Sequence, residues 1–353
     1  MKKLLAAIVI CATLLCAACG TSHSTGGKPG GETGGSVLPS TGTSSGAGGS
    51  ALPSETPAQP SETLAQPSSP GGTVLPGGQP TTLPSEKPTP GDPSVSPSAS
   101  PSGEKIRTET AFFTRGENKI YATLYFPAEK KEKYPAVILS HSAFLTGSTL
   151  KDYAEGLAKR GFLCCTFDFC GGGYSSKSDG KIKDMTVFTE AEDLSAVFAA
   201  VAARGDVDEE NIYLFGSSQG GLVSAIVAAE KKTAVRGLFL LYPAFNIADQ
   251  VREYESAGSV SGLLPVGEAF LSTLKNYDPF AEIGNFTGNV LICHGTKDGT
   301  VPIAYSQKAA GVYRSCTLVE IAGAPHGFNA ANFSFLHDYD AEVWKAIDAF
   351  LAK

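Results

Sequence analysis

One stretch near the middle of the 353-residue chain, residues 211–229, has the pattern of a buried strand, a sharp turn and a helix. Residues 212–215 form a short run of β-branched, aromatic and large apolar side chains, as a buried parallel strand requires. Leu222, Ile226 and Ala229 follow at helical spacing. We therefore interpret the rest of the chain as support for the residue at the turn, Ser218.

The turn itself has the pattern Gly-x-Ser-x-Gly, with Gly216 and Gly220 on either side of Ser218. A serine between such elements lies on a strained turn with its hydroxyl exposed, and the glycines let strand and helix approach. Residues 42–46 match the same pattern but lie in a Ser/Gly/Pro tract without strand or helix, so that copy predicts nothing. The alternative is a tight turn whose serine caps a helix; the context favours a nucleophile at Ser218.

Composition changes sharply near residue 103, which predicts one folded domain over residues 104–353. About 250 residues are enough for a large core. A net charge of -7 and a pI near 5.4 argue against a nucleic-acid partner, because nucleic-acid binding needs a basic face.

Residues 1–19 have the pattern of an export signal, with Lys2 and Lys3 before a short apolar run. The end of this run, residues 16–20, resembles the lipobox of bacterial lipoproteins, although Cys16 stands where such signals usually carry Leu. The resemblance implies a lipid on Cys19 that anchors the protein to the membrane outside the cytoplasm. Cleavage to a soluble secreted protein, or an uncleaved anchor, are the alternatives.

Residues 20–103 consist mainly of Thr, Ser, Gly and Pro. Such a segment buries too little apolar surface to offset its ordering entropy, so we expect a disordered linker. It would serve as a plain spacer between the lipid anchor and the domain.

Five cysteines remain outside the export segment: Cys164, Cys165, Cys170, Cys293 and Cys316. Four of them lie in apolar runs, where free cysteine behaves as a small hydrophobe. Their odd number and spacing argue against a full disulfide framework and against a zinc site. One disulfide remains open.

The folded domain alternates strands and helices. Strands are predicted over residues 109–114, 120–126, 136–140, 162–167, 212–215, 237–242, 290–293 and 317–321, and helices over residues 149–160, 186–203, 222–231, 302–312 and 339–351. Because the central strands are continuously apolar, both faces of the sheet should be covered, which predicts a doubly wound, mostly parallel α/β sheet of eight strands. In such sheets the active site lies at the carboxyl ends of the strands.

Two further polar residues follow strand ends. Asp298 comes after the strand at residues 290–293, and His326 comes after the strand at residues 317–321. The order Ser218, Asp298, His326 is that of the α/β-hydrolase triad. Alone, Asp298 would be a common turn residue and His326 an exposed loop histidine, but three coincidences in one order favour catalysis.

The chemistry explains these residue types. A serine hydroxyl needs an adjacent base, here His326, and the base needs a carboxylate, here Asp298, to orient it and stabilise its charged form. An oxyanion hole is also required. We expect one donor to be the backbone N–H of Gln219 and the other to be that of Ala143, with Ser142 as the next choice.

Residues 106–353 resemble the α/β-hydrolase superfamily, and within it the cinnamoyl/feruloyl esterase branch near the monoacylglycerol lipases and serine aminopeptidases. The resemblance is carried by residues 141–144, residues 167–175, the Ser218 turn and the Asp298 and His326 loops. It implies the α/β-hydrolase fold. Two positions depart from the family pattern: Ser142 replaces the glycine of a usual His-Gly pair, and Ser217 stands where the family usually has His.

The family builds part of its pocket from an insertion that corresponds here to residues 244–288, a small cap. Its aromatic residues, which are either a pocket lining or the cap's own core, are Phe245, Tyr254, Phe270, Tyr277, Phe280 and Phe286. Asp168 should hold its loop by hydrogen bonds rather than take part in chemistry.

The sequence therefore predicts a serine hydrolase without metal or organic cofactor, most simply a carboxylesterase acting on a small-molecule ester, including hydroxycinnamoyl-type esters. A peptidase or acylglycerol lipase of the same fold is the nearest alternative. An alternative of another class is a catalytically inactive surface-binding lipoprotein. The sequence leaves the oligomeric state open.

Overall fold

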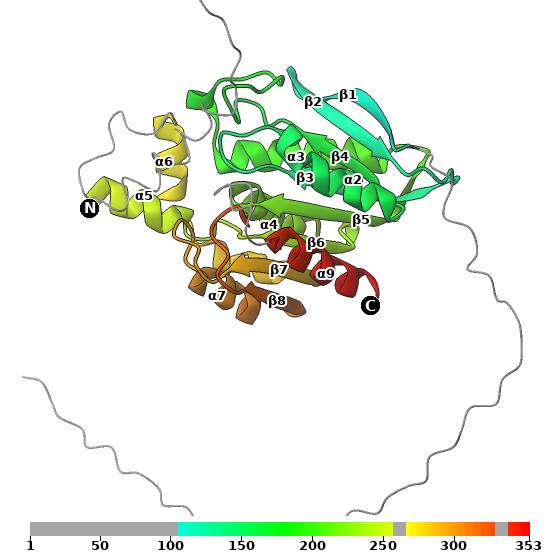
Figure 1. Ribbon diagram of the computed structural model, residues 1–353. Coiled ribbons are helices and arrows are strands. Elements are labelled where there is room, and N and C mark those ends of the chain that lie inside the picture. The colour runs from blue at the N-terminus through cyan, green and yellow to red at the C-terminus, as the bar shows by residue number, and fades with distance from the viewer. Residues whose placement is uncertain (1–104, 257–265, 329–337) are drawn as a thin grey trace, which may run out of the picture. The chain divides into compact units, whose positions relative to one another are not determined.

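A computed structural model describes residues 105–256, 266–328 and 338–353. The predicted export signal, the expected lipid site at Cys19 and the predicted linker lie outside the described residues. Within them, eight strands form one sheet (Figure 1). The strands are β1 (Arg107–Arg115), β2 (Asn118–Phe126), β3 (Tyr134–Ser140), β4 (Leu163–Phe167), β5 (Val207–Ser217), β6 (Gly237–Leu241), β7 (Asn289–Gly295) and β8 (Cys316–Ile321).

The strand order is β1-β2-β4-β3-β5-β6-β7-β8. β2 pairs antiparallel with both β1 and β4, and every other neighbouring pair in the sheet is parallel. This arrangement confirms the predicted eight-stranded, mostly parallel sheet. The parallel register places the carboxyl ends of β5, β7 and β8, after which Ser218, Asp298 and His326 follow, along one edge.

Seven α-helices are described: α2 (Lys151–Lys159), α3 (Val187–Ala202), α4 (Gln219–Lys231), α5 (Ile247–Ser256), α6 (Glu268–Leu274), α7 (Ala304–Val312) and α9 (Tyr339–Leu351). Five correspond to the predicted helices. α5 and α6 lie in the cap region and were not predicted as helices. Their apolar residues Val251, Phe270 and Leu274 are buried, so packing rather than sequence propensity stabilises these short helices.

The sheet separates two cores. Alternate residues of β3 point to opposite faces, so Ala136 and Ile138 join one cluster while Val137 and Leu139 join the other. The first cluster includes buried residues of α3 and α4, and the second includes those of α2 and α9. Helices thus cover both faces, as the continuous apolar strands predicted.

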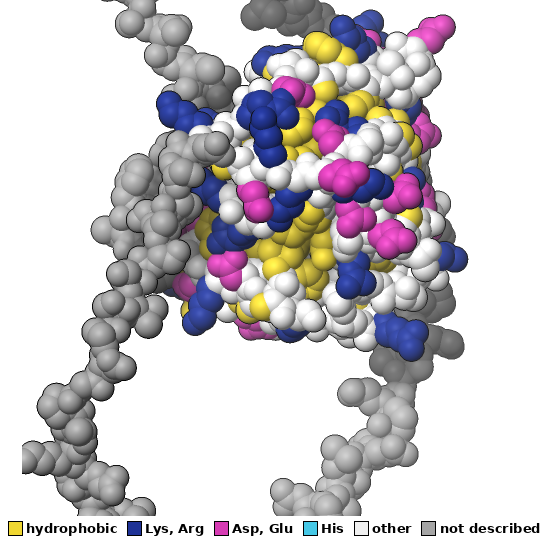
Figure 2. Space-filling view, turned by 90° about the vertical axis from the view of Figure 1, so that its right-hand side faces the viewer, with side chains coloured by type: hydrophobic (Ala, Val, Ile, Leu, Met, Phe, Trp, Pro, Cys, Tyr) yellow, Lys and Arg dark blue, Asp and Glu magenta, His cyan; other side chains and the backbone are white. Residues whose placement is uncertain are grey.

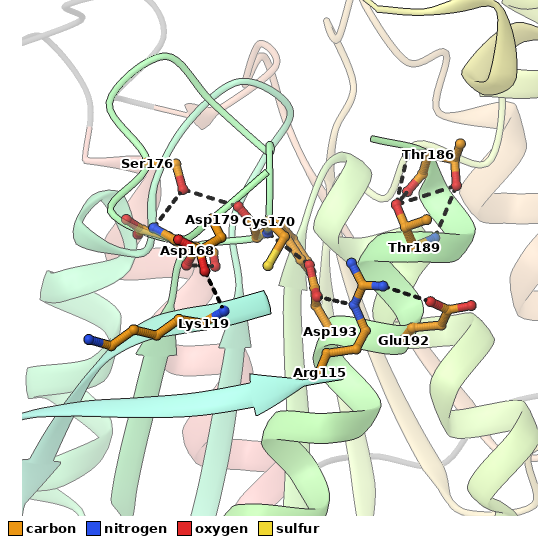
Figure 3. A network of polar contacts seen from close by, with 12 residues as sticks. Arg115, Lys119, Asp168, Cys170, Ser176, Asp179, Thr186, Thr189, Glu192 and Asp193 are labelled. Carbon is orange, nitrogen blue, oxygen red and sulfur yellow. Dashed lines mark hydrogen bonds and ion pairs between the residues drawn. The ribbon is translucent and has the colours of Figure 1, made fainter. Parts of the chain in front are cut away.

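The long connection between β4 and α3 is fastened to the β1–β2 hairpin and to α3 (Figure 3). Asp193, buried on α3, accepts hydrogen bonds from Arg115 Nε at 2.5 Å and from the backbone N–H of Cys170 at 2.8 Å. At the other end, the backbone N–H of Lys119 donates to Asp179 Oδ2 at 2.8 Å. The connection, which borders the carboxyl edge of the sheet, is therefore held at several points.

A hollow of about 520 Å³ lies at the other end of the strands. Pro135, Phe162 and Tyr213 line it together with the end of α9. Figure 2 shows this end of the molecule, with an apolar patch among charged side chains. Since the predicted catalytic residues follow the opposite ends of the strands, this hollow is not the candidate active site.

All five cysteines of the described domain are free thiols. The disulfide left open by the sequence is therefore not formed among them. Four of them are buried and Cys316 is partly buried, which agrees with a packing role. In the described ranges, no helix combines the length and the apolar character needed to cross a membrane.

Candidate active site

Ser218 occupies the tight turn between β5 and α4 with φ 51° and ψ −118°, a strained backbone conformation for a residue with a side chain. Its backbone is held from both sides, because its N–H donates to Leu241 O and its C=O accepts from the N–H of Ala244, both at 2.9 Å. A Cβ at Gly216 would lie 2.2 Å from Gly220 O. The flanking glycines are therefore needed for the strand and helix to approach, as expected.

The structure brings the three predicted catalytic side chains together. His326 Nε2 lies 3.0 Å from Ser218 Oγ, and His326 Nδ1 lies 2.7 Å from Asp298 Oδ2. The close approach of their loops depends on Gly295 at the end of β7, where a Cβ would lie 2.2 Å from Ala324 O. Base and nucleophile are within hydrogen-bond reach, and the carboxylate fixes the other ring nitrogen, as nucleophilic catalysis by serine requires.

The Asp298 carboxylate is buried and held in place by backbone donors. Its Oδ1 accepts hydrogen bonds from the N–H groups of Thr300 and Val301, each at 2.8 Å. Burial raises the pKa of Asp298, but hydrogen bonds from His294, His326 and the Val301 backbone outweigh burial and hold that pKa below its ordinary value. Asp298 is therefore a carboxylate at neutral pH, the form that stabilises a protonated His326.

His294 is a neighbour of the triad to which the sequence analysis gave no role. It is fully buried, and its Nε2 lies 3.2 Å from Asp298 Oδ2. The signal in the sequence was its position four residues before Asp298, at the end of the preceding strand.

The expected oxyanion donor at Gln219 begins α4, directly after Ser218. Its buried side chain donates from Nε2 to Glu190 Oε2 at 2.7 Å. Burial raises the pKa of Glu190 to about 8, against the smaller lowering effect of the hydrogen bond from Gln219. Glu190, on α3, was also missed by the sequence analysis, because nothing in the pattern of α3 indicates that this face meets Gln219.

The other expected donor, Ala143, lies in the loop after β3. His141 holds this loop: the N–H of Phe169 donates to His141 Nε2 at 3.1 Å, so the ring hydrogen is on Nδ1, which donates to Ser142 O at 2.8 Å. Burial lowers the pKa of His141, which favours this neutral form.

Ser142 and Ser217, the two departures from the family pattern, contact each other. Their hydroxyl oxygens lie 2.9 Å apart, and Ser142 Oγ also donates to Ser217 O at 3.3 Å. These contacts join the loop of one expected oxyanion donor to the strand end that precedes the other.

Phe144 follows Ala143 in the loop after β3. Its backbone has φ 60° and forms a parallel bridge with Gly173 of the β4–α3 connection. Tyr174, which follows Gly173, is 77% exposed. The sequence analysis gave no role to this tyrosine, which stands beside the expected oxyanion loop.

Asp168 plays the structural role expected of it. Its buried carboxylate accepts from the N–H of Gly147 and from the N–H of Lys177, both at 2.8 Å. It thereby connects the oxyanion loop region to the β4–α3 connection rather than facing the triad.

The aromatic residues of the cap mainly form its own core. Phe245, Tyr254, Phe270 and Phe286 are buried, whereas Tyr277 and Phe280 are partly buried and pack against Phe188 and Phe245 respectively. Of the predicted cap, residues 257–265 lie outside the described residues. Across the parts of the chain that are described, no group of three or more His, Cys, Asp or Glu side chains is arranged to hold a metal ion.

Comparison with known proteins identifies hydrolases and esterases that are similar to this chain. Residues 131–279 match the family model described as serine aminopeptidase, S33. A probable isoprenylcysteine alpha-carbonyl methylesterase from Oryza sativa subsp. japonica is 25% identical, with 54% of this chain and 50% of that protein covered. The chain thus spans about half the length of this curated relative.

Solved structures are similar over most of the described domain. The ferulic acid complex of Est1E from Butyrivibrio proteoclasticus is 25% identical with a TM-score of 0.60, covering 69% of this chain and 98% of that chain. Mouse alpha/beta hydrolase domain-containing protein 10 is 18% identical with a TM-score of 0.51, covering 69% of this chain and 98% of that one, and shows the fold alone. From its sheet, its Ser218 turn and these relatives, we conclude that the chain has the α/β-hydrolase fold and is similar to serine hydrolases and esterases that share it.

Proposed function

We propose that this protein is a serine carboxylesterase. The observation that carries the proposal is the continuous line of contacts from Ser218 Oγ through His326 to Asp298, with heavy-atom distances of 3.0 and 2.7 Å. The esterase names among its relatives, a methylesterase and Est1E with bound ferulic acid, support ester bonds as the substrate class.

In the proposed reaction, Ser218 Oγ attacks the ester carbonyl while His326 Nε2 takes the hydroxyl proton. The N–H groups of Gln219 and Ala143 stabilise the oxyanion of the tetrahedral intermediate. When the C–O bond breaks, His326 gives the proton to the leaving alcohol, and the acyl group remains on Ser218. A water molecule then attacks the acyl-enzyme with His326 again as the base, and the acid is released.

For the acyl group, we propose a substrate range that includes hydroxycinnamoyl esters. The support is the Est1E structure, which contains ferulic acid, together with the exposed Tyr174 and the partly buried Tyr277 and Phe280. Aromatic side chains with partly accessible rings are suited to contact an aromatic acyl group. The packing of the other cap aromatics into a core limits how many can do so.

A peptidase is the second candidate, because the matching family model is described as a serine aminopeptidase. An acylglycerol lipase is a further alternative of the same fold. A panel of short p-nitrophenyl esters, methyl ferulate, a monoacylglycerol and an aminoacyl p-nitroanilide separates these activities. Esterase activity predicts turnover of the esters, and turnover confined to the nitroanilide would contradict it.

The same panel, run on the full chain and on Ser218→Ala, tests catalysis itself. Ester turnover that disappears in Ser218→Ala is the expected result. If the parent turns over no member of the panel, the inactive surface-binding protein becomes the better explanation.

We also propose that the protein is anchored outside the cytoplasm through a lipid on Cys19. The support is the lipobox-like pattern at residues 16–20, after a charged and then apolar segment. Metabolic labelling with a fatty-acid analogue should label the parent and Cys16→Ala but not Cys19→Ala. Labelling retained in Cys19→Ala would contradict a lipid on Cys19, and a parent that takes up no label would favour a soluble secreted protein.

A further inference from the structure

His294 is held inside the protein by three partners. Its ring lies between the end of β7 and α7, where Nδ1 is 2.7 Å from Ser306 Oγ and Nε2 is 2.9 Å from Val301 O. Nε2 is also 3.2 Å from Asp298 Oδ2. Both His294 and Ser306 are fully buried, so the ring has little freedom to move or to exchange these partners for water.

The partners fix which ring nitrogen carries a hydrogen. A carbonyl oxygen only accepts, so Nε2 of His294 must be a donor to Val301 O. The same hydrogen is shared with Asp298 Oδ2, in the three-centre arrangement common where acceptors crowd one N–H. His294 is therefore a donor to the catalytic carboxylate.

The Asp298 oxygen that His294 contacts is also the one that holds His326, the proposed catalytic base. Asp298 Oδ2 receives His326 Nδ1 at 2.7 Å and His294 Nε2 at 3.2 Å, whereas Oδ1 is taken up by two backbone N–H groups. Each donor draws charge from the carboxylate. The attraction that Asp298 exerts on a protonated His326 is weaker with His294 present than it would be without it.

We propose that His294 is a positioning residue that donates to the same Asp298 oxygen as His326 and limits how strongly Asp298 stabilises the protonated form of His326. The inference rests on the proposed function, since it assigns His294 to the same triad. It predicts that removal of the His294 donor strengthens the attraction of Asp298 for a protonated His326.

Other groups face this cluster. Within the described residues, the ring of Tyr242 packs edge-on against His326, with centroids 4.7 Å apart, and the buried Asp298 carboxylate lies between the two histidines. Tyr242 is unchanged in the variants below. A change in the titration of His326 on substitution of His294 is therefore attributable to the shared carboxylate.

The test follows His326 by NMR in the full chain. With only five histidines in the sequence, selective labelling gives few ring signals, and His326→Ala identifies the one of interest. In His294→Leu, which removes the Nε2 donor, we expect His326 to titrate about half a unit to one unit higher than in the parent. Ser306→Ala, which keeps His294 but removes the partner of its Nδ1, should shift His326 in the same direction by less.

The control is Gln307→Ala. Gln307 follows Ser306 on α7, and its side chain donates to the exposed Glu320 and does not contact the triad. This variant should leave the titration unchanged. No shift of His326 in His294→Leu, or a shift to lower pH, would overturn the proposal. If His294→Leu fails to fold, Ser306→Ala decides alone.

Kinetics give a second readout that separates the two proposals. If the protein is an esterase, the acidic limb of kcat/KM should move to higher pH in His294→Leu, with KM nearly unchanged. Loss of activity without movement of that limb indicates a merely structural role and overturns the inference. A His326 shift by NMR in a protein without esterase activity would retain the inference about His294 and reject the proposed function.

Discussion

Ser142 and Ser217 lie 75 positions apart in the chain, yet their hydroxyl oxygens are 2.9 Å from each other. Each is a departure from the usual family residue, and together they connect the loop that contains Ala143 to the strand end that carries Ser218. Because both expected oxyanion donors adjoin this contact, it should keep them at the spacing that the tetrahedral intermediate needs.

Replacing Ser142 with Ala should therefore lower kcat with little change in KM. We expect a loss of roughly tenfold, smaller than the ~10²-fold or more that follows removal of a whole oxyanion donor. Ser142→Ala/Ser217→Ala should lose little more than Ser142→Ala, since both substitutions remove the same contact. The control is Ser148→Ala, which removes an exposed hydroxyl near the same loop. If Ser142→Ala had the same kcat as this control, the Ser142–Ser217 contact would not position the oxyanion donors.

The two supporting members of the triad should be needed as much as the nucleophile. Asp298→Asn and His326→Ala should each lower kcat by about 10³-fold or more, because the three residues act as a unit. Circular dichroism and thermal melting should show that the fold persists. A near-parental rate in either variant would remove that residue from the mechanism.

Glu190 gives the stability of the domain a pH dependence. Burial raises the pKa of Glu190 in the folded protein to about 8 from an ordinary value of 4.5, so between these pH values the folded side chain holds a proton that the unfolded chain releases. This contribution to stability is complete below about pH 4.5, falls by at most roughly 1.4 kcal/mol per pH unit as the pH rises, and is lost above about pH 8.

Glu190→Gln keeps a side-chain oxygen that can accept the hydrogen bond from Gln219, but the new side chain cannot ionise. Its melting temperature should therefore decline less than that of the parent between pH 5 and 8, measured in the same buffers. Glu192→Gln, an exposed carboxylate on the same helix, is the control. Parallel melting curves for the parent and Glu190→Gln across this range would contradict the buried-acid account.

Gly220 allows the start of α4 to approach β3. A Cβ at this position would lie 2.3 Å from Ser140 O and 2.4 Å from His141 O, so the backbone must move to admit it. Gly220→Ala should cost about 1–3 kcal/mol in the free energy of unfolding and should lower activity by displacing the oxyanion donors. Urea unfolding checks the first effect. Gly205→Ala, where a Cβ meets no atom within 4 Å, should behave like the parent.

The sequence was sufficient to predict the sheet and the three triad residues for one physical reason. Parallel strands buried on both faces are continuous apolar runs, and catalytic side chains follow their carboxyl ends. Ser218, Asp298 and His326, which the structure brings together, could therefore be singled out from the strand ends, the Gly-x-Ser-x-Gly turn and their order in the chain. Strand bounds were less accurate: β5 begins at Val207, five residues before the predicted start, because its first part is polar and partly exposed.

Contacts between distant segments were not predictable in this way. Ser142 and Ser217 were noted separately as departures, and Glu190 gave no sign that it meets Gln219. His294 lies only four residues before Asp298, but its ring reaches the carboxylate only because the chain turns back after Gly295. The short helices α5 and α6 were missed since tertiary packing stabilises them.

The central claim is that Ser218 is a nucleophile activated by His326. It is tested most directly by treating the full chain with a fluorophosphonate and locating the adduct by mass spectrometry. One adduct on the peptide containing Ser218, absent in Ser218→Ala and formed far more slowly in His326→Ala, is the predicted result. No adduct on the folded parent, or labelling that persists in Ser218→Ala, would contradict the claim.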